Sequence, residues 1–193
     1  RPVPKYHPEY LTGVNEQNLV ILDDADVWVT FVSEGAGYRN VLAYYTYDRD
    51  FPPTTPQDIK ECYVIFPNAS FEYYGGGLRS GDKVYLGTFE KNTVVGWMLM
   101  RDGWHGPSQQ STQGRGLLYS NLELNPEEDI AHRQHSVLLL DDERDVILIA
   151  FEDLIRPGGD NDFNDAVFYV SANPIENIEI ENEPETELSD YLS

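Results

Sequence analysis

The sequence predicts an all-β fold: an antiparallel β-sandwich of jelly-roll-like form with about eight or more strands. Short apolar runs recur along the chain with turn residues between them, and no segment shows the 3.6-residue apolar periodicity of a long helix. The 15 Gly and 12 Pro residues fit a chain with many turns. Short strands at this spacing are typical of sandwiches.

Each predicted strand is rich in β-branched or aromatic residues and is followed by residues that favour turns. The run 27–32 alternates along its length, and the run 41–47 ends at the acidic turn 48–50. A short helical turn fits residues 55–59. In chain order, we expect strands at 27–32, 41–47, 62–66, 83–89, 93–100, 117–122, 136–140, 146–151 and 166–170.

A chain of 193 residues can bury one good core, so we expect one domain. Residues 1–15 are Pro-rich and predict a lead-in segment, and residues 16–173 carry the sandwich. Residues 174–193 contain seven acids and no base, which favours a disordered tail or a linker.

The net charge of −21 excludes several partners. Of the 34 acids, 27 remain when the seven in the tail are set aside, against 13 bases. Such a surface does not suit nucleic acid, whose phosphates need basic side chains, nor docking on an anionic membrane. Since no apolar run approaches 18 residues, we also expect no direct membrane insertion.

The single cysteine, Cys62, excludes an intrachain disulfide and a cysteine-based zinc site. It lies in the apolar run 62–66, where we expect it to be a small buried hydrophobe.

The most informative segment is 151–170, in which an apolar strand delivers two acids and a turn rich in Gly and Pro precedes five more Asp and Asn residues. Carboxylates this dense repel one another unless a cation lies between them. Hard oxygen donors on a short loop suit Ca²⁺. The predicted ligands are Glu152, Asp153, Asp160, Asp162, Asn164 and Asp165.

The loop differs from an EF-hand. Asp160, Asp162 and Asn164 match ligand positions 1, 3 and 5, but Asp165 stands where an EF-hand needs Gly and Ser171 where it needs a bidentate Glu. Residues 167–170 also favour a strand. The sequence therefore predicts a strand-loop-strand calcium site.

The alternative for this segment is a solvated acidic turn, because Asp, Asn and Gly are ordinary turn residues. Phe163 argues against it. An aromatic side chain inside a polar loop indicates that the loop folds back onto the core and holds its acids in place.

With these features placed, the chain resembles the bacterial DUF4114 domain, which is related to the LruC-type domains. The resemblance covers about residues 35–172. It is carried by segments 37–45, 65–68, 81–87, 95–97 and 103–104, and most specifically by Phe151-Glu-Asp-Leu154 with Gly158-Gly-Asp-Asn-Asp-Phe-Asn-Asp165. It implies a calcium-bound β-sandwich in a secreted or cell-surface bacterial protein, often adhesin-like, with no enzymatic activity attached to the family.

Aromatic residues beside glycines offer a possible ligand platform at Tyr73, Tyr74 and Trp104. Loops with exposed aromatics often bind ligands, and carbohydrate or another surface protein is the partner we expect. The alternative is that most of these aromatics belong to the core.

Three other sets of residues are weaker indications of a functional site. His132 and His135 lack the third soft ligand that zinc needs. Paired acids such as Glu34 with Glu152 allow a glycosidase, but a chain with 34 acids always offers such pairs. The acids at 23–26 and 48–50 suit either a second ion or turn caps.

The sequence therefore favours a calcium-binding, non-catalytic β-sandwich module that acts in adhesion or carbohydrate recognition. The alternative is a purely structural spacer domain that calcium makes rigid. A carbohydrate-active hydrolase is the third hypothesis.

Overall fold

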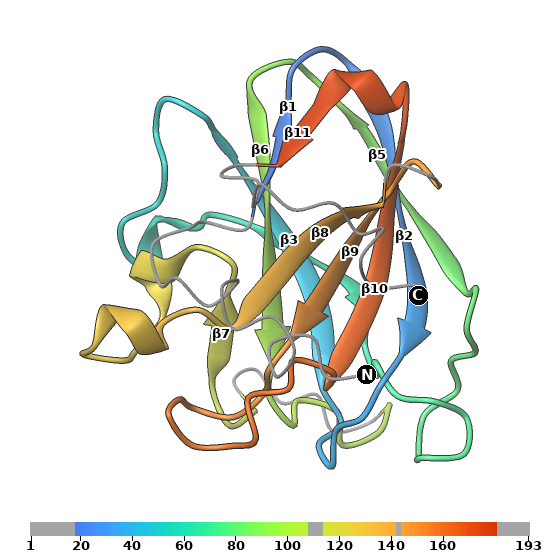
Figure 1. Ribbon diagram of the computed structural model, residues 1–193, viewed down its shortest axis with the longest axis vertical. Helices are drawn as coiled ribbons and strands as arrows, with labels where there is room; N and C mark the ends of the chain where they lie inside the picture. Colours follow the sequence, from blue (N-terminus) through green and yellow to red (C-terminus); the bar gives the residue numbers. More distant parts are fainter. Residues whose placement is uncertain (1–17, 108–113, 142–143, 181–193) are drawn as a thin grey trace.

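The computed structural model describes residues 18–107, 114–141 and 144–180. These residues form eleven strands in two antiparallel sheets that pack face to face (Figure 1). The all-β prediction is confirmed, and the two sheets have the arrangement of a sandwich. The predicted lead-in and residues 181–193 of the predicted tail lie outside the described residues.

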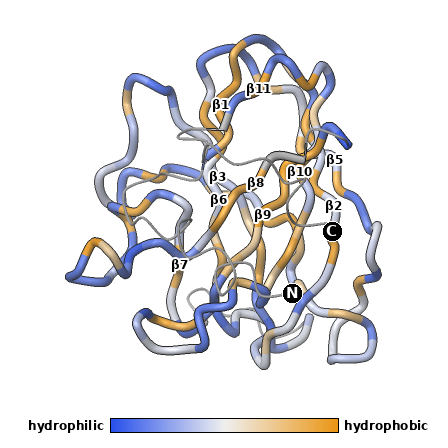
Figure 2. Tube along the Cα trace, in the orientation of Figure 1, coloured by the Kyte–Doolittle hydropathy of each residue, from blue (hydrophilic) through white to orange (hydrophobic). Residues whose placement is uncertain are grey.

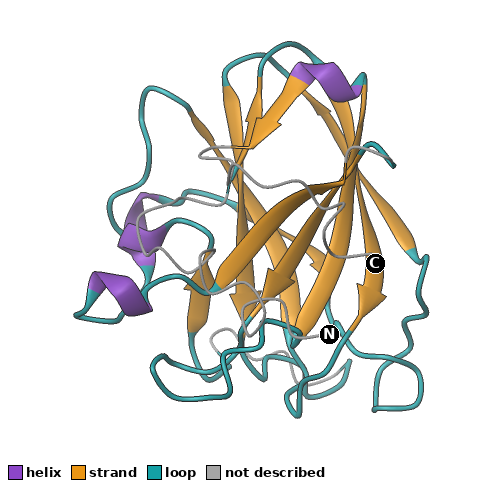
Figure 3. Cartoon of the chain, viewed as in Figure 1, coloured by secondary structure: helices purple, strands orange, loops and turns teal. Residues whose placement is uncertain are grey.

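The strands are β1 (Leu19–Ile21), β2 (Ala25–Ser33), β3 (Val41–Asp48), β4 (Cys62–Phe66), β5 (Lys83–Phe89), β6 (Thr93–Met100), β7 (Leu117–Tyr119), β8 (Ser136–Asp141), β9 (Val146–Phe151), β10 (Ala166–Asn173) and β11 (Ile178–Ile180). One sheet has the order β11-β1-β6-β3-β4, with β7 also paired to β6, and the other has the order β5-β2-β10-β9-β8. The short 3₁₀ turns lie outside the sheets (Figure 3). Among them, η2 (Pro56–Asp58) confirms the helical turn expected at 55–59.

Strand β2 shows how the sequence pattern produces the core. Its residues alternate between buried and partly buried, so Val27, Val29 and Phe31 face inward. Phe168 of β10 stacks on Phe66 of the opposite sheet with ring centroids 5.9 Å apart. Apolar residues follow the strands, and the loops at the two ends are largely hydrophilic (Figure 2).

The prediction for the C-terminal end of the fold needs correction. Residues 174–180 belong to the domain, because η5 (Ile175–Asn177) leads into β11, which pairs with β1. Ile178 packs against the main core, so this apolar residue gives the acidic segment a buried contact. β1 was not predicted because it has only three residues.

Cys62 is exposed, so the expectation of a buried thiol is wrong. It opens β4, the edge strand of its sheet, and its neighbours Tyr63 and Val64 are exposed too. The apolar run 62–66 therefore covers the core only through its last two residues, Ile65 and Phe66. The described residues contain no helix with the length and apolar character that crossing a membrane requires.

Candidate metal centre

The acidic loop connects β9 to β10 at one end of the sandwich, where the loops after β2 and after β4 also lie (Figure 1). Phe151 and Ala166 are paired at its base, and the Asp165 amide donates to the Phe151 carbonyl oxygen. The hairpin thus brings residues twelve and thirteen positions apart in sequence, Asp165 with Asp153 and Glu152, to one place.

Phe163 anchors the loop, as the sequence predicted. Its ring is fully buried and packs with Val137, Leu139 and Ala150 on one face of the β8-β9-β10 sheet. Its backbone φ is 52°, which is unfavourable for a bulky residue. Burial of the ring offsets this strain and holds the acids on either side of it in fixed positions.

Arg156 holds the acidic loop in place through hydrogen bonds. Its Nε donates to Asn161 Oδ1 at 2.7 Å, and its Nη1 donates to the Gln134 carbonyl oxygen at 2.9 Å. Its guanidinium also lies over the ring of Phe163, 5.6 Å from the centroid. The acidic loop is therefore tied to the segment that precedes β8.

Glu152 is the central acid. The side chain is fully buried, and its Oε1 accepts a hydrogen bond from the Leu154 amide at 3.3 Å. Its Oε2 is buried and has no hydrogen-bond partner within the described part of the chain. A buried carboxylate oxygen without a donor is costly, and a cation would satisfy it.

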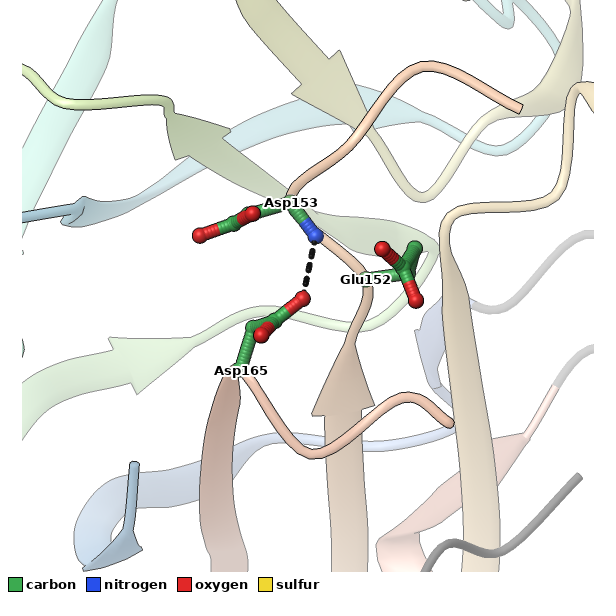
Figure 4. A group of neighbouring side chains, drawn as sticks. All are labelled: Glu152, Asp153 and Asp165. Atoms are coloured by element: carbon green, nitrogen blue, oxygen red, sulfur yellow. Dashed lines mark hydrogen bonds between the residues drawn. The ribbon is translucent and has the colours of Figure 1, made fainter. Parts of the chain in front are cut away.

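Asp153 and Asp165 lie beside Glu152, with the Asp165 carboxylate directed toward the Asp153 amide (Figure 4). The Asp153 amide donates to Asp165 Oδ2 at 2.8 Å, and Asp153 Oδ2 accepts from Asn40 Nδ2 at 2.7 Å. One carboxylate oxygen from each of these three acids lies within 4.8 Å of the corresponding oxygens of the other two. A second set at the same spacing comprises Glu152, Asp160 and Asp162.

The electrostatics of the loop follow from burial and like charge. Burial raises the pKa of Glu152 to about 7, and repulsion from Asp160, Asp153 and Asp162 adds to the effect. Burial likewise raises the pKa of Asp165 to about 7, with added repulsion from Asp153 and Glu152. The pKa values of Asp153 and Asp162 are also raised, mainly by burial. Near neutral pH, Glu152 and Asp165 are therefore partly protonated, and a cation that binds them would displace those protons.

Asn164 has a different environment from the acids. Its backbone amide and its Nδ2 both donate to the Asp162 carboxylate, at 3.1 and 2.5 Å. Its carbonyl oxygen accepts from the Gly35 amide at 3.0 Å. A β-carbon at position 35 would lie 2.1 Å from Asn164 Oδ1, so the loop after β2 packs closely on the acidic loop at a glycine. Asn164 thus orients Asp162.

A pocket of about 400 Å³ opens onto the acids. Its walls are formed by Gly37, Tyr38 and Leu154 together with Glu152, Asp153, Asp160 and Asp165. No sequence pattern predicts that Tyr38 lines this pocket or that Asn40 holds Asp153. Both lie in the loop after β2, more than 100 positions from the acids they approach, and segment 37–45, which carries part of the family resemblance, does not itself indicate which acids it lies against.

The three aromatic residues of the predicted ligand platform differ in exposure. Tyr73 and Tyr74 are 86% and 73% exposed, whereas Trp104 is half-buried. Both segments contact Arg39: the Trp104 amide donates to its carbonyl oxygen at 3.0 Å, and a β-carbon at Gly75 would lie 3.2 Å from its Nε. Segment 37–40 therefore touches the acidic pocket and both aromatic loops.

The two histidines do not share a site. His135 is buried, with Nε2 2.7 Å from Glu127 Oε1 and Nδ1 3.3 Å from the Glu152 carbonyl oxygen. The His132 ring lies 3.5 Å from Asp129 instead. His135 thus supports the base of the acidic loop through its hydrogen bonds.

The remaining acid clusters are turn caps. Asp48 Oδ1 accepts from the Asp50 amide at 2.9 Å, and Asp24 Oδ1 accepts from the Lys91 amide at 3.2 Å. Asp26 Oδ1 accepts from Tyr85 and Thr88. Each of these three acids thus has one oxygen engaged by donors of the chain itself.

The fold and the site define an antiparallel β-sandwich whose end loop brings acids together in sets that can bind a metal ion. Residues 89–173 match a family described as "Domain of unknown function (DUF4114)". The predicted resemblance is thus confirmed over strands β6 to β10 and the whole acidic loop, while the matching region begins after segments 37–45, 65–68 and 81–87. Searches of curated proteins and of solved structures find no match to this chain.

Proposed function

We propose that the chain is a calcium-binding, non-catalytic β-sandwich module in which the ion joins the end of β9 to the start of β10. The observation that carries the proposal is the fully buried Glu152, whose Oε2 has no hydrogen-bond partner in the described regions and which faces four other acids. A cation there would offset both the cost of burying these carboxylates and their mutual repulsion.

Calcium suits the donor set best among common biological metals. Both sets consist of carboxylates alone, and calcium takes six to eight oxygen ligands in flexible geometry. Zinc and copper favour imidazole and thiolate groups. The nearby imidazole, that of His135, is engaged with Glu127 and with the backbone of Glu152.

Thermal unfolding of the chelator-treated chain tests calcium binding. Calcium at about 100 times its dissociation constant should add about 2.7 kcal/mol of stability. Magnesium at the same concentration should add less, because it demands a tighter octahedral shell. Equal melting temperatures in calcium and in EDTA would refute the proposal.

We further propose that the module recognises carbohydrate next to the ion, in a secreted or cell-surface bacterial protein. The supporting observation is segment 37–40, which lines the acidic pocket through Tyr38 and contacts the loops of Tyr73, Tyr74 and Trp104 through Arg39. Exposed aromatic rings offer flat apolar faces on which sugar rings can stack.

A glycan array with calcium and with EDTA tests this second proposal. Binding that requires calcium and falls at least tenfold in Tyr73→Ala or Tyr74→Ala would support it. Calcium-dependent stability without glycan binding would favour the rigidified spacer. Polysaccharide turnover that a Glu152→Gln change abolishes would favour the hydrolase.

A further inference from the structure

The acids of the loop fall into two sets that share one member. Glu152, Asp153 and Asp165 form the set at the strand ends, and Glu152, Asp160 and Asp162 form the set farther out on the loop. In each set, one carboxylate oxygen from each acid lies within 4.8 Å of the corresponding oxygens of the other two. Glu152 therefore occupies the boundary between two candidate ion positions.

Glu152 has the free coordination capacity that a bridging ligand needs. A carboxylate offers two oxygens with about four lone-pair positions. Only Oε1 accepts a hydrogen bond, from the Leu154 amide, and the buried Oε2 has no partner in the described segments. One oxygen can thus serve each ion.

The charge of the loop also favours two ions. The five acids carry a formal charge of −5 when ionised, so one Ca²⁺ leaves −3 and two leave −1. Arg101 and Arg156 offset part of this charge through their interactions with Asp153 and Glu152, but they donate their hydrogen bonds to other groups. Arg156 donates to Asn161 and to backbone carbonyls, and Arg101 Nε donates to the Asp153 backbone oxygen at 2.5 Å.

The volume of the pocket is also sufficient for two ions. The pocket of about 400 Å³ is lined by Asp153 and Asp165 of the first set and by Asp160 of the second. A water molecule takes up about 30 Å³ of liquid, so the pocket has room for two partly hydrated ions. The five carboxylates have ten oxygens, five of which also accept hydrogen bonds, so water would complete the shell of six to eight oxygens around each ion.

We propose that the loop binds two calcium ions bridged by the Glu152 carboxylate. This inference rests on the proposed calcium binding and adds a stoichiometry and an assignment of ligands. Asp153 and Asp165 hold the inner ion, and Asp160 and Asp162 hold the outer one.

Native mass spectrometry and calorimetric titration with Ca²⁺ of the whole chain test the stoichiometry. We expect two ions per wild-type chain, one in Asp160→Asn, one in Asp165→Asn and none in Glu152→Gln at calcium concentrations that saturate the wild type. Asp160 is exposed and Asn at position 165 can still accept from the Asp153 amide, so both single variants should fold. Circular dichroism verifies this.

Glu90→Gln is the matched control and should retain two ions. Glu90 is exposed and follows the end of β5, where Phe89 pairs with Ala25, whereas the acidic loop lies near Ser33 at the other end of β2.

Each alternative result has a distinct meaning. A wild-type stoichiometry of one refutes the second ion and leaves the proposed calcium module intact. No bound calcium refutes the calcium module itself and the inference with it. Two ions in the wild type with one retained in Glu152→Gln refute the bridge.

Discussion

At the scale of single residues, Glu152 explains most of the behaviour we expect from this chain. It is fully buried and surrounded by other acids, so the same side chain opposes folding when ionised without a cation and stabilises the fold when a cation is bound. A change at this position should therefore have effects of opposite sign in the two conditions.

Glu152→Gln should reverse the order of stability between calcium and EDTA. In EDTA at pH 8 the variant should be more stable than the wild type, by roughly 1–2 kcal/mol, because it removes a buried charge. In saturating calcium it should be less stable, because the ion is lost. Denaturant unfolding in both conditions measures this. A variant that is less stable in both would show that Glu152 is needed for packing alone.

Gly159 is the second residue whose identity the site requires. Its φ is +78°, and a β-carbon there would lie 2.6 Å from Glu152 Oε1. Gly159→Ala should cost about 1–2 kcal/mol and weaken calcium binding, because both the backbone and Glu152 must shift. Gly77→Ala is the control, since a β-carbon there meets nothing within 4 Å. Equal calcium affinities in the two variants would contradict this account of the loop.

At the scale of elements, the sequence predicts long alternating strands well and short ones poorly. β2, with alternating burial over nine residues, follows from its pattern, whereas β1 and β11 have three residues each and depend on pairing with each other. Burial of Cys62 was wrongly predicted because composition does not reveal that β4 is an edge strand. Edge position is a property of the whole sheet.

The candidate site likewise contains residues that could be predicted from one stretch of sequence and residues that only the fold brings together. The acids of the loop could be predicted because they lie in one segment that β9 and β10 close into a hairpin. Asn40 and Tyr38 could not, because only the packing of the loop after β2 brings them to the pocket. Local sequence thus predicts the ion, and tertiary structure supplies the walls of its pocket.

The role of β11 leads to a test at this scale. Ile178 packs against the main core from a segment that composition assigns to a tail. Ile178→Ala should lower stability by about 1 kcal/mol through lost burial, whereas Glu176→Ala, at an exposed position, should change it by less than about 0.5 kcal/mol. Chemical denaturation measures both. Equal effects would mean that this segment contributes no burial.

At the scale of the whole molecule, we expect the acidic loop to make stability depend on pH and on calcium together. Glu152 and Asp165 have ordinary pKa values of 4.5 and 3.8 and reach about 7 in the folded chain. A group that binds its proton more tightly when folded stabilises the fold below its unfolded pKa. That contribution is lost as the pH rises through the folded pKa.

The calcium-free chain should therefore lose stability between about pH 4 and pH 7, on the order of 2 kcal/mol. Calcium replaces the protons, so its stabilising effect should be larger at pH 8 than at pH 5. Melting curves at the two pH values, each with calcium and with EDTA, measure the difference. A calcium effect of equal size at both would contradict the assignment of these acids as ligands.

The central claim is that the acids around Glu152 bind calcium, and a crystal structure grown with calcium tests it most directly. The account predicts anomalous calcium density within 2.3–2.6 Å of oxygens of Glu152, Asp153 and Asp165. A coordination position open toward Tyr38 would leave room for a ligand. Well-ordered acids with only water between them, at a calcium concentration in the millimolar range, would contradict the account.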